Sequence, residues 1–91
     1  MLYMKMERLT ELEKVILLSI LILNKGVRDK DIKEDDIVLK FPMRQRKNVR
    51  RYIEKLVKKK LLKKKDGKYR MTEKGYKLAK ELLFLGGSFV R

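Results

Sequence analysis

The chain has 91 residues, of which 44% are hydrophobic, a length and composition that suit one domain with one core. Its formal net charge is +14 and its isoelectric point is about 10.2. Because so many like charges repel one another, this imbalance favours a polyanionic partner. The chain contains neither cysteine nor histidine, which excludes disulfides, thiolate or imidazole metal sites and the common nucleophile pairs of hydrolases. We therefore expect no metal, no cofactor and no enzymatic activity.

The apolar residues give no indication of a membrane or secretory segment. The longest apolar run, Val15–Leu23, is interrupted only by Ser19 and is far shorter than the ~20 residues of a transmembrane helix. The residues before it mix acidic and basic side chains and lack the layout of a signal peptide. We expect a cytoplasmic, nucleoid-associated protein with no membrane partner. Its abundant lysine and glutamate, with little asparagine and glutamine, give an archaeal or thermophile-like composition.

The positive charge is concentrated in the middle of the chain. Residues 1–39 hold seven Lys/Arg and eight Asp/Glu, residues 40–80 hold eighteen and three, and residues 81–91 hold one of each. Charge that only keeps a protein soluble is spread with both signs mixed. A central segment with a net charge of +15 therefore indicates a surface directed at an anionic partner.

Thr10 and Glu13 have the T-x-x-E spacing of a capping box, which predicts that a helix begins there. This helix is expected to end within residues 24–26, where Gly26 can adopt the left-handed conformation of a C-cap. Apolar residues in the range 15–23 cover almost its whole circumference rather than one stripe. Either the helix lies at the centre of the core, or its outer face contacts a second subunit.

Between this helix and the basic segment, the pattern predicts a short helix that leads into a turn. Val27–Arg28 is a candidate short strand. Asp31 and Glu34 repeat the capping spacing ahead of further apolar residues, which predicts a second, short helix. Pro42 cannot continue a helix and restricts the residue before it, so Phe41–Met43 is expected to form a turn.

A third helix is expected after the turn. The apolar residues at helical spacing there are Val49, Ile53, Leu56 and Val57. They predict a helix over about residues 44–60. Two helices joined by a short turn are a helix-turn-helix candidate. Arg50 lies at the edge of the apolar stripe, where it can pair with Glu54 one turn further on.

Asp66–Gly67 predicts a two-residue type I′ hairpin turn, because both central positions need positive φ and these residue types tolerate it. Counting outward pairs Lys65 with Lys68 and Lys63 with Arg70. Alternation separates two sides of the hairpin: Leu62, Lys64, Tyr69 and Met71 on one, and Lys63, Lys65, Lys68 and Arg70 on the other. Like charges directly across a strand pair are destabilising, so the four cations favour an anion such as a phosphate backbone. The alternative is an edge hairpin that its lysines protect from aggregation.

Thr72 is expected to cap a last helix that ends before Gly86–Gly87. Its predicted inward stripe comprises Tyr76, Ala79, Leu82 and Leu83. The apolar surface beyond this stripe, together with the apolar first helix, indicates a two-fold dimer. The residues predicted at the dimer interface are Leu17, Leu18, Leu21, Phe84 and Leu85. The two ends, residues 1–8 and 86–91, either contact the second subunit or are flexible tails.

The predicted order is helix, short strand, helix, turn, helix, hairpin and helix. In this order, residues 9–85 resemble the winged helix-turn-helix domains of bacterial and archaeal transcription regulators of the MarR-like and PadR-like kind. The resemblance is carried by KNVRRYIEKLVKKKLLKKKDGKY (residues 47–69), similar to the recognition helix and wing, and by the T-E-K-G of Thr72–Gly75, which opens the following helix. It implies a mainly α fold with a small β-hairpin in one domain, residues 1–91. Met43–Arg46 stands where such domains often have a capping serine or threonine.

The resemblance implies that the third helix lies in the major groove of double-stranded DNA, while the wing, residues 61–71, follows the backbone or minor groove. The side of the third helix opposite its apolar stripe then carries the candidate contacts. The candidates for base contact are Arg44, Asn48 and Arg51, because an arginine fork matches guanine and a carboxamide matches adenine. The candidates for phosphate contact are Lys47, Lys55, Lys58, Lys63, Lys65, Lys68 and Arg70.

These features together predict a sequence-specific DNA-binding protein that acts as a dimeric transcriptional regulator. The same charge serves a nonspecific chromatin or architectural protein equally well. A third interpretation is a winged helix that acts as a protein-interaction subunit of a transcription or replication assembly, because the fold alone does not fix the function. No residue identifies a small-molecule effector.

Overall fold

The computed structural model describes residues 9–26 and 30–90, with side chains up to residue 84. The elements, in chain order, are α1 (Glu11–Leu23), β1 (Ile32–Lys33), α2 (Glu34–Val38), the 3-10 helix η2 (Met43–Gln45), α3 (Arg46–Lys58), β2 (Leu62–Lys65), β3 (Lys68–Met71) and α4 (Glu73–Val90). The expected mainly helical fold with a small antiparallel sheet is confirmed. Within the described residues, no helix is long and apolar enough to cross a membrane.

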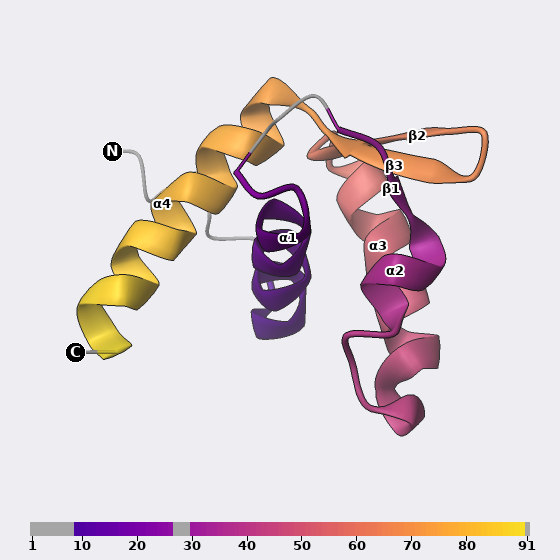
Figure 1. The fold of residues 1–91 in the computed structure, drawn as a ribbon, viewed down its shortest axis with the longest axis horizontal. Helices are drawn as coiled ribbons and strands as arrows, with labels where there is room; N and C mark the ends of the chain where they lie inside the picture. The colour runs from indigo at the N-terminus through magenta and orange to yellow at the C-terminus, as the bar shows by residue number, and fades with distance from the viewer. Residues whose placement is uncertain (1–8, 27–29, 91) are drawn as a thin grey trace.

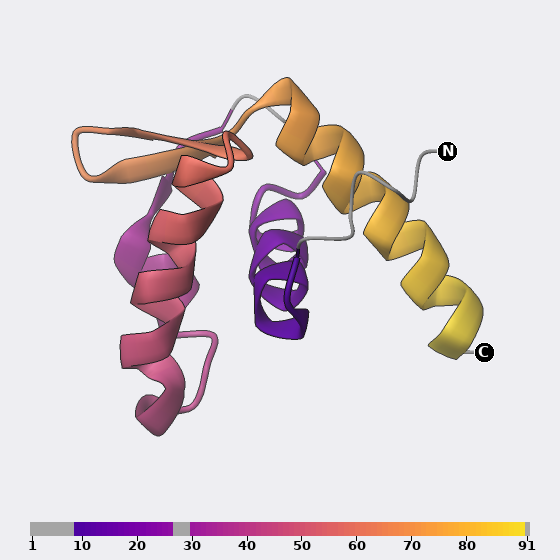
Figure 2. The ribbon, with the colours of Figure 1, turned by 180° about the vertical axis from the view of Figure 1, so that it is seen from behind.

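Helix α1 occupies the centre of the fold, between α4 on one side and α3 on the other (Figure 1). Ile16, Leu17 and Ile20 of α1 are fully buried, so its wide apolar surface is used mainly inside the core. Helix α3 contributes Val49, Ile53 and Leu56, which are also fully buried, as their spacing predicted. The β2–β3 hairpin projects away from α4, on the side of the molecule that also holds α2 and α3 (Figure 2).

The ends of α1 follow the local signals in the sequence. Thr10 accepts a hydrogen bond from the backbone N–H of Glu13, and the carboxylate of Glu13 accepts one from the backbone N–H of Thr10, so the predicted capping box is confirmed. At the other end, Lys25 and Gly26 have φ of 55° and 81°, and the N–H of Gly26 donates to the carbonyl of Leu21. Gly26 therefore ends the helix in the left-handed conformation that was expected.

The carboxylate of Glu13 also forms an ion pair that the sequence does not predict. Lys59, just beyond the end of α3, donates through Nζ to both oxygens of Glu13, at 2.9 and 3.0 Å. The Glu13 side chain is 1% exposed. Burial by itself raises the pKa of Glu13, but the hydrogen bond from the backbone of Thr10 and the contact with Lys59 hold that pKa below its ordinary value of 4.5. This pair fastens the end of α3 to the beginning of α1.

Replacing Glu13 by Gln is expected to lower the free energy of unfolding at neutral pH by about 1.5–3 kcal/mol. The substitution removes the charged hydrogen bond between Lys59 and the buried Glu13 carboxylate. The carboxylate has a lowered pKa in the folded state, so its stabilisation is present above the unfolded pKa near 4.5 and is lost as the pH falls through the folded pKa. Urea unfolding at neutral and acidic pH measures both effects.

Glu11→Gln is the matched control, since Glu11 lies in the same turn but is 91% exposed and pairs only at the surface with Lys14. The difference between the wild type and Glu13→Gln should shrink below pH 4.5. Equal effects of the two substitutions would show that the buried pair contributes nothing.

The second capping box, predicted at Asp31 and Glu34, is wrong. Ile32 and Lys33 form strand β1 instead of the beginning of a helix, and α2 starts only at Glu34 without a side-chain cap. Ile32 pairs with Tyr69 of β3 and is buried, so sheet pairing overrides the local capping signal. The candidate strand at Val27–Arg28 lies outside the described residues.

Strand β1 converts the expected hairpin into a three-stranded antiparallel sheet with the order β1-β3-β2. The predicted register of the hairpin is confirmed, with Lys65 opposite Lys68 and Lys63 opposite Arg70. The turn residues Asp66 and Gly67 have φ of 53° and 76°, as a type I′ turn requires.

Helix α4 begins as expected, since the Thr72 hydroxyl accepts from the N–H of Gly75 and caps the helix. Its inward stripe needs two corrections: Leu78 is buried, although the prediction omitted it, and Leu83 is 49% exposed. The helix also runs through Gly86–Gly87 to Val90. Glycine disfavours a helix by only about 1 kcal/mol, so it does not end one unless a left-handed cap forms.

Candidate nucleic-acid interface

The turn between α2 and α3 is shaped by Pro42 and held by Arg46. Pro42 has φ of −57° and ψ of 148°, which ends the helical conformation as predicted. The Nε of Arg46 donates to the carbonyl of Phe41 at 3.1 Å. The predicted helix over residues 44–60 is therefore divided: Arg44 lies in η2, and α3 itself begins at Arg46.

The outer side of α3 carries side chains that the core does not use. The six residues predicted there are all exposed: Arg44, Lys47, Asn48, Arg51, Lys55 and Lys58. Lys55 Nζ lies 4.8 Å from the centre of the Tyr52 ring, a cation–π contact along the helix. Among the described residues, none of the five cations in this group pairs with a carboxylate. This side of α3 is therefore a uniformly positive surface.

Arg50, which lies next to that surface, has a different partner from the predicted one. It donates to Glu34 and lies 3.6 Å from Asp35, both on α2, instead of pairing with Glu54. Helix α2 packs against α3 and brings its acidic first turn to Arg50. The one-turn spacing to Glu54 therefore predicted the wrong partner, because α2 is distant from Arg50 in sequence and its approach is not visible from spacing along α3.

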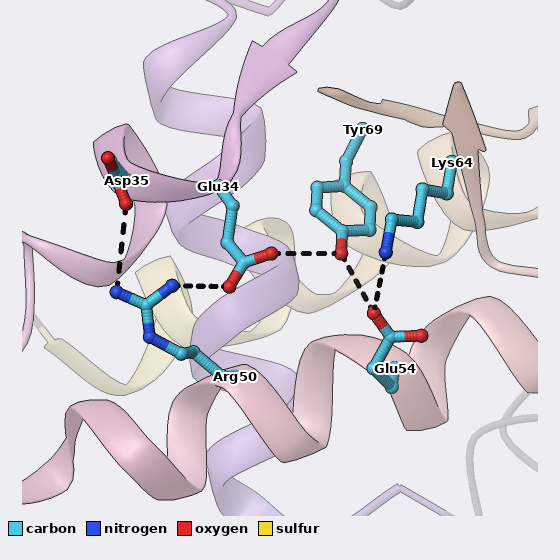
Figure 3. A network of polar contacts seen from close by, with 6 residues as sticks. All are labelled: Glu34, Asp35, Arg50, Glu54, Lys64 and Tyr69. Atoms are coloured by element: carbon cyan, nitrogen blue, oxygen red, sulfur yellow. Dashed lines mark hydrogen bonds and ion pairs between the residues drawn. The ribbon is translucent and has the colours of Figure 1, made fainter. Parts of the chain in front are cut away.

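Glu54 instead joins the sheet through Tyr69 and Lys64 (Figure 3). The Tyr69 hydroxyl lies 2.9 Å from Glu54 Oε2 and 3.2 Å from Glu34 Oε1, and Lys64 Nζ lies 3.4 Å from Glu54 Oε2. Burial, and then the hydrogen bond to Glu54, raise the pKa of Tyr69 well above its ordinary range. The phenol is therefore a neutral donor at physiological pH.

The side of the sheet that faces α3 is largely apolar. Leu62, Tyr69 and Met71 are buried there, while Lys64 reaches Glu54. Since side chains alternate across a strand, the predicted cations lie on the other side of the sheet, which we call the outer sheet face: Lys63, Lys65, Lys68 and Arg70. This face points away from α3. The positive surfaces of α3 and of the sheet are therefore separate.

The outer sheet face is hollowed and contains carboxylates that the prediction did not include. Its four cations, with Asp31 and Asp66, line a recess of about 370 Å³. Arg70 donates through Nε to Asp31 at 2.9 Å, so part of its charge is neutralised. Asp31 is brought there by β1, the strand that the sequence pattern missed. The two lysines opposite each other at the tip, Lys65 and Lys68, are both exposed.

The dimer interface predicted on α1 is only partly available. Leu17 is 0% exposed inside the monomer core, so it cannot contact a second copy. Leu18 is half-buried against the core, and Leu21, although only 3% exposed, lines an apolar hollow at the surface. Phe84 is 77% exposed, and the side chain of Leu85 lies outside the described part. Among the side chains that the structure describes, the exposed large apolar ones of α1 and α4 are Val15, Ile22, Leu83 and Phe84. Ile22 and Leu83 line one apolar hollow of about 260 Å³.

The fold defines a helix-turn-helix protein with a wing. It has a short helix, a turn and a second helix with an exposed basic side, and a β-hairpin projects beside them. A comparison with protein families agrees: the model described as winged helix-turn-helix matches residues 15–85. The chain belongs to this family, whose fold suggests DNA binding and is typically non-catalytic. The match does not show the expected similarity to MarR-like or PadR-like regulators. Comparisons with curated proteins and with solved structures gave no significant match.

Proposed function

We propose that this protein binds double-stranded DNA in a sequence-specific manner and acts as a dimeric transcriptional regulator. The observation that carries the proposal is the segregation of charge on α3. Cations beside the core are held by carboxylates, as in Arg50 with Glu34 and Lys59 with Glu13. The exposed cations on the outer side of α3 have no such partner among the described residues. Unpaired cations on a helix are suited to a phosphate backbone.

Within this proposal, the N-terminal part of the outer surface reads the bases. Arg44, Asn48 and Arg51 are the groups whose planar donors and acceptors match base edges in the major groove. Lys47, Lys55 and Lys58 contact phosphates and set the register. On the wing, Lys65 and Lys68 flank the tip, with Lys63 and Arg70 behind them on the outer sheet face. The proposal has the two tip lysines contact a phosphate backbone of the same duplex.

Arg51→Ala is expected to weaken binding to the preferred site and to reduce its advantage over other sequences, by about 1–3 kcal/mol at one base position. Lys65→Ala should weaken binding to all sequences alike, because a phosphate contact carries no sequence information. Fluorescence anisotropy with a selected site and with a scrambled duplex measures, for each variant, the affinity for both DNAs and the ratio between them.

Lys77→Ala is the matched control for the loss of one positive charge, since Lys77 lies on α4 and is 71% exposed beside Glu73. It should leave both affinities nearly unchanged. If Arg51→Ala and Lys65→Ala change every sequence by the same factor, the assignment of base contacts to α3 is wrong.

A second copy is proposed to cover the apolar surface of α1 and α4. Four exposed apolar side chains lie on these two helices, and two of them, Ile22 and Leu83, line one hollow together with Leu21. A two-fold dimer through this surface would present two α3 helices to half-sites about one DNA turn, ~34 Å, apart. Sedimentation equilibrium and the spacing of half-sites in selected DNA test this arrangement independently.

The outer sheet face favours one alternative function, that of an architectural DNA-binding protein. Its cations point away from α3, so they are placed to hold a second stretch of phosphate backbone. Sequencing of DNA fragments selected by the purified protein separates the two functions. An enriched motif supports the regulator. The architectural protein is supported if no motif is enriched and if the protein, bound to a duplex on beads, also captures a second, free duplex.

A further inference from the structure

The Tyr69 side chain connects three separate elements of the interface. Its ring is fully buried on β3, the central strand of the sheet. Its hydroxyl lies between two carboxylates, Glu34 at the beginning of α2 and Glu54 on α3 (Figure 3). One phenol group therefore joins the wing to both helices of the helix-turn-helix.

The charges around the hydroxyl are balanced by two cations. Arg50 holds the other oxygen of Glu34, and Lys64 approaches the Glu54 oxygen that Tyr69 contacts. The phenol has one proton, which it can donate to only one carboxylate at a time. Each carboxylate therefore needs its own cation, and both cations are present. The arrangement is a continuous chain of polar contacts, which runs from Asp35 and Arg50 through Glu34 to the phenol and on to Glu54 and Lys64 (Figure 3).

The covalent connection between α3 and the wing is short and lies at one end of both elements. Helix α3 ends at Lys58, and β2 begins at Leu62, after a residue with positive φ, Lys60. The hairpin tip extends away from this junction (Figure 1). The hairpin is also held by β1, which pairs with β3 at Tyr69 and Lys68, so its angle to α3 depends on the contacts that this sheet makes with the two helices. The Tyr69–Glu54 contact, one helical turn before the end of α3, is such a contact.

We propose that Tyr69 is a positioning residue, whose hydroxyl fixes the angle between the wing and α3 so that both engage one duplex as a rigid unit. The proposal rests on the proposed function for its effect on DNA. The claim about the angle is independent of DNA and can be measured without it.

The first experiment measures the angle directly. The chain has no cysteine, so Lys47→Cys on α3 and Lys68→Cys on the wing introduce two unique sites for spin labels. Pulsed electron paramagnetic resonance then gives the distance distribution between them. Tyr69→Phe keeps the buried ring and removes only the hydroxyl, and should broaden this distribution. An unchanged distribution overturns the proposal.

Tyr76→Phe is the matched control. The Tyr76 hydroxyl donates to the carbonyl of Gly26 at 2.9 Å, so the substitution removes a hydroxyl hydrogen bond of similar length between other elements. It should leave the distance distribution as in the wild type. If it broadens the distribution as much as Tyr69→Phe does, the effect is general loosening, and the proposal is wrong.

The second experiment tests the consequence for DNA by a double-mutant cycle. If the wing is held by Tyr69, the loss of affinity caused by Lys65→Ala should shrink by about two-fold or more in the Tyr69→Phe background. In the Tyr76→Phe background, Lys65→Ala should reduce the affinity by the same factor as it does in the wild type. A purely structural role of the hydroxyl would lower stability and leave the Lys65 effect unchanged, which contradicts the proposal.

Glu54 provides a second route that does not alter the buried ring. Glu54→Ala removes the acceptor on α3 and should broaden the distance distribution, whereas Glu54→Gln keeps an acceptor oxygen and should restore it toward the wild type. Equal widths in the two variants overturn the proposal. If the wild type fails to bind duplex while Tyr69→Phe still broadens the distribution, the proposed function fails and the positioning role stands.

Discussion

Raising the salt concentration from about 50 to 200 mM is expected to weaken binding of the proposed dimer to duplex DNA by roughly 10³–10⁵-fold. Each neutralised phosphate contributes a slope near −0.9 to the log–log plot, and we expect about 6–10 phosphates per dimer. The physical reason is the release of counterions from the phosphate backbone when lysines replace them. Anisotropy titrations at several salt concentrations give the slope.

The structure indicates which cations set this slope. Arg50, Lys59, Lys64 and Arg70 already have carboxylate partners and should contribute little. Lys47 has no carboxylate partner among the described residues, so Lys47→Ala, which removes one phosphate contact from each of two copies, should reduce the magnitude of the slope by about two units. Lys77→Ala, on α4, should not change it. An affinity that is insensitive to salt would exclude phosphate contacts as the source of binding.

Gly75→Ala is expected to destabilise the protein by about 2 kcal/mol or more, although alanine is the better helix former. Gly75 lies in the first turn of α4, and a Cβ added there would lie 2.0 Å from the carbonyl oxygen of Leu61. That oxygen accepts from the N–H of Thr72, which limits its movement. Overpacking costs up to about 3 kcal/mol and occasionally more, and a backbone oxygen moves less easily than a side chain, while the gain in helix propensity is only about 1 kcal/mol.

Thermal or urea unfolding measures this change. Lys74→Ala is the control in the same turn, because Lys74 is exposed and its substitution should change stability by less than about 0.5 kcal/mol. A stabilised Gly75→Ala variant would show that α4 can move away from Leu61. The expected loss explains why glycine is needed within T-E-K-G, where helix propensity alone disfavours it.

The parts of the fold that local rules predict are those whose causes lie within a few residues. The capping box of Thr10 and Glu13 and the left-handed Gly26 define α1. The Asp66–Gly67 turn sets the register of the hairpin, because the two strands must pair outward from it. The apolar spacing of α3 shows which side is buried and thus which side is exposed. The candidate site on α3 follows from the same helical spacing, because its residues lie on the side opposite the apolar stripe.

The errors arose where a distant segment competes for a local group. Asp31 has capping spacing to Glu34, but β1 pairs with β3 and Asp31 binds Arg70. Arg50 has Glu54 one turn away, yet the acidic turn of α2 is closer in space. Neither competitor is visible from sequence spacing, because both depend on how α2 and the sheet pack on α3.

The amino-acid sequence by itself determined the class of fold, the hairpin and the concentration of positive charge in residues 40–80, since turn chemistry, helical periodicity and composition are local properties. Only the tertiary structure decided which charges remain unpaired. Packing places Glu13 on Lys59, Glu34 on Arg50 and Asp31 on Arg70, and it turns the cations of the outer sheet face away from α3. Pairing of opposite charges requires closeness in space, and chain order alone does not specify it.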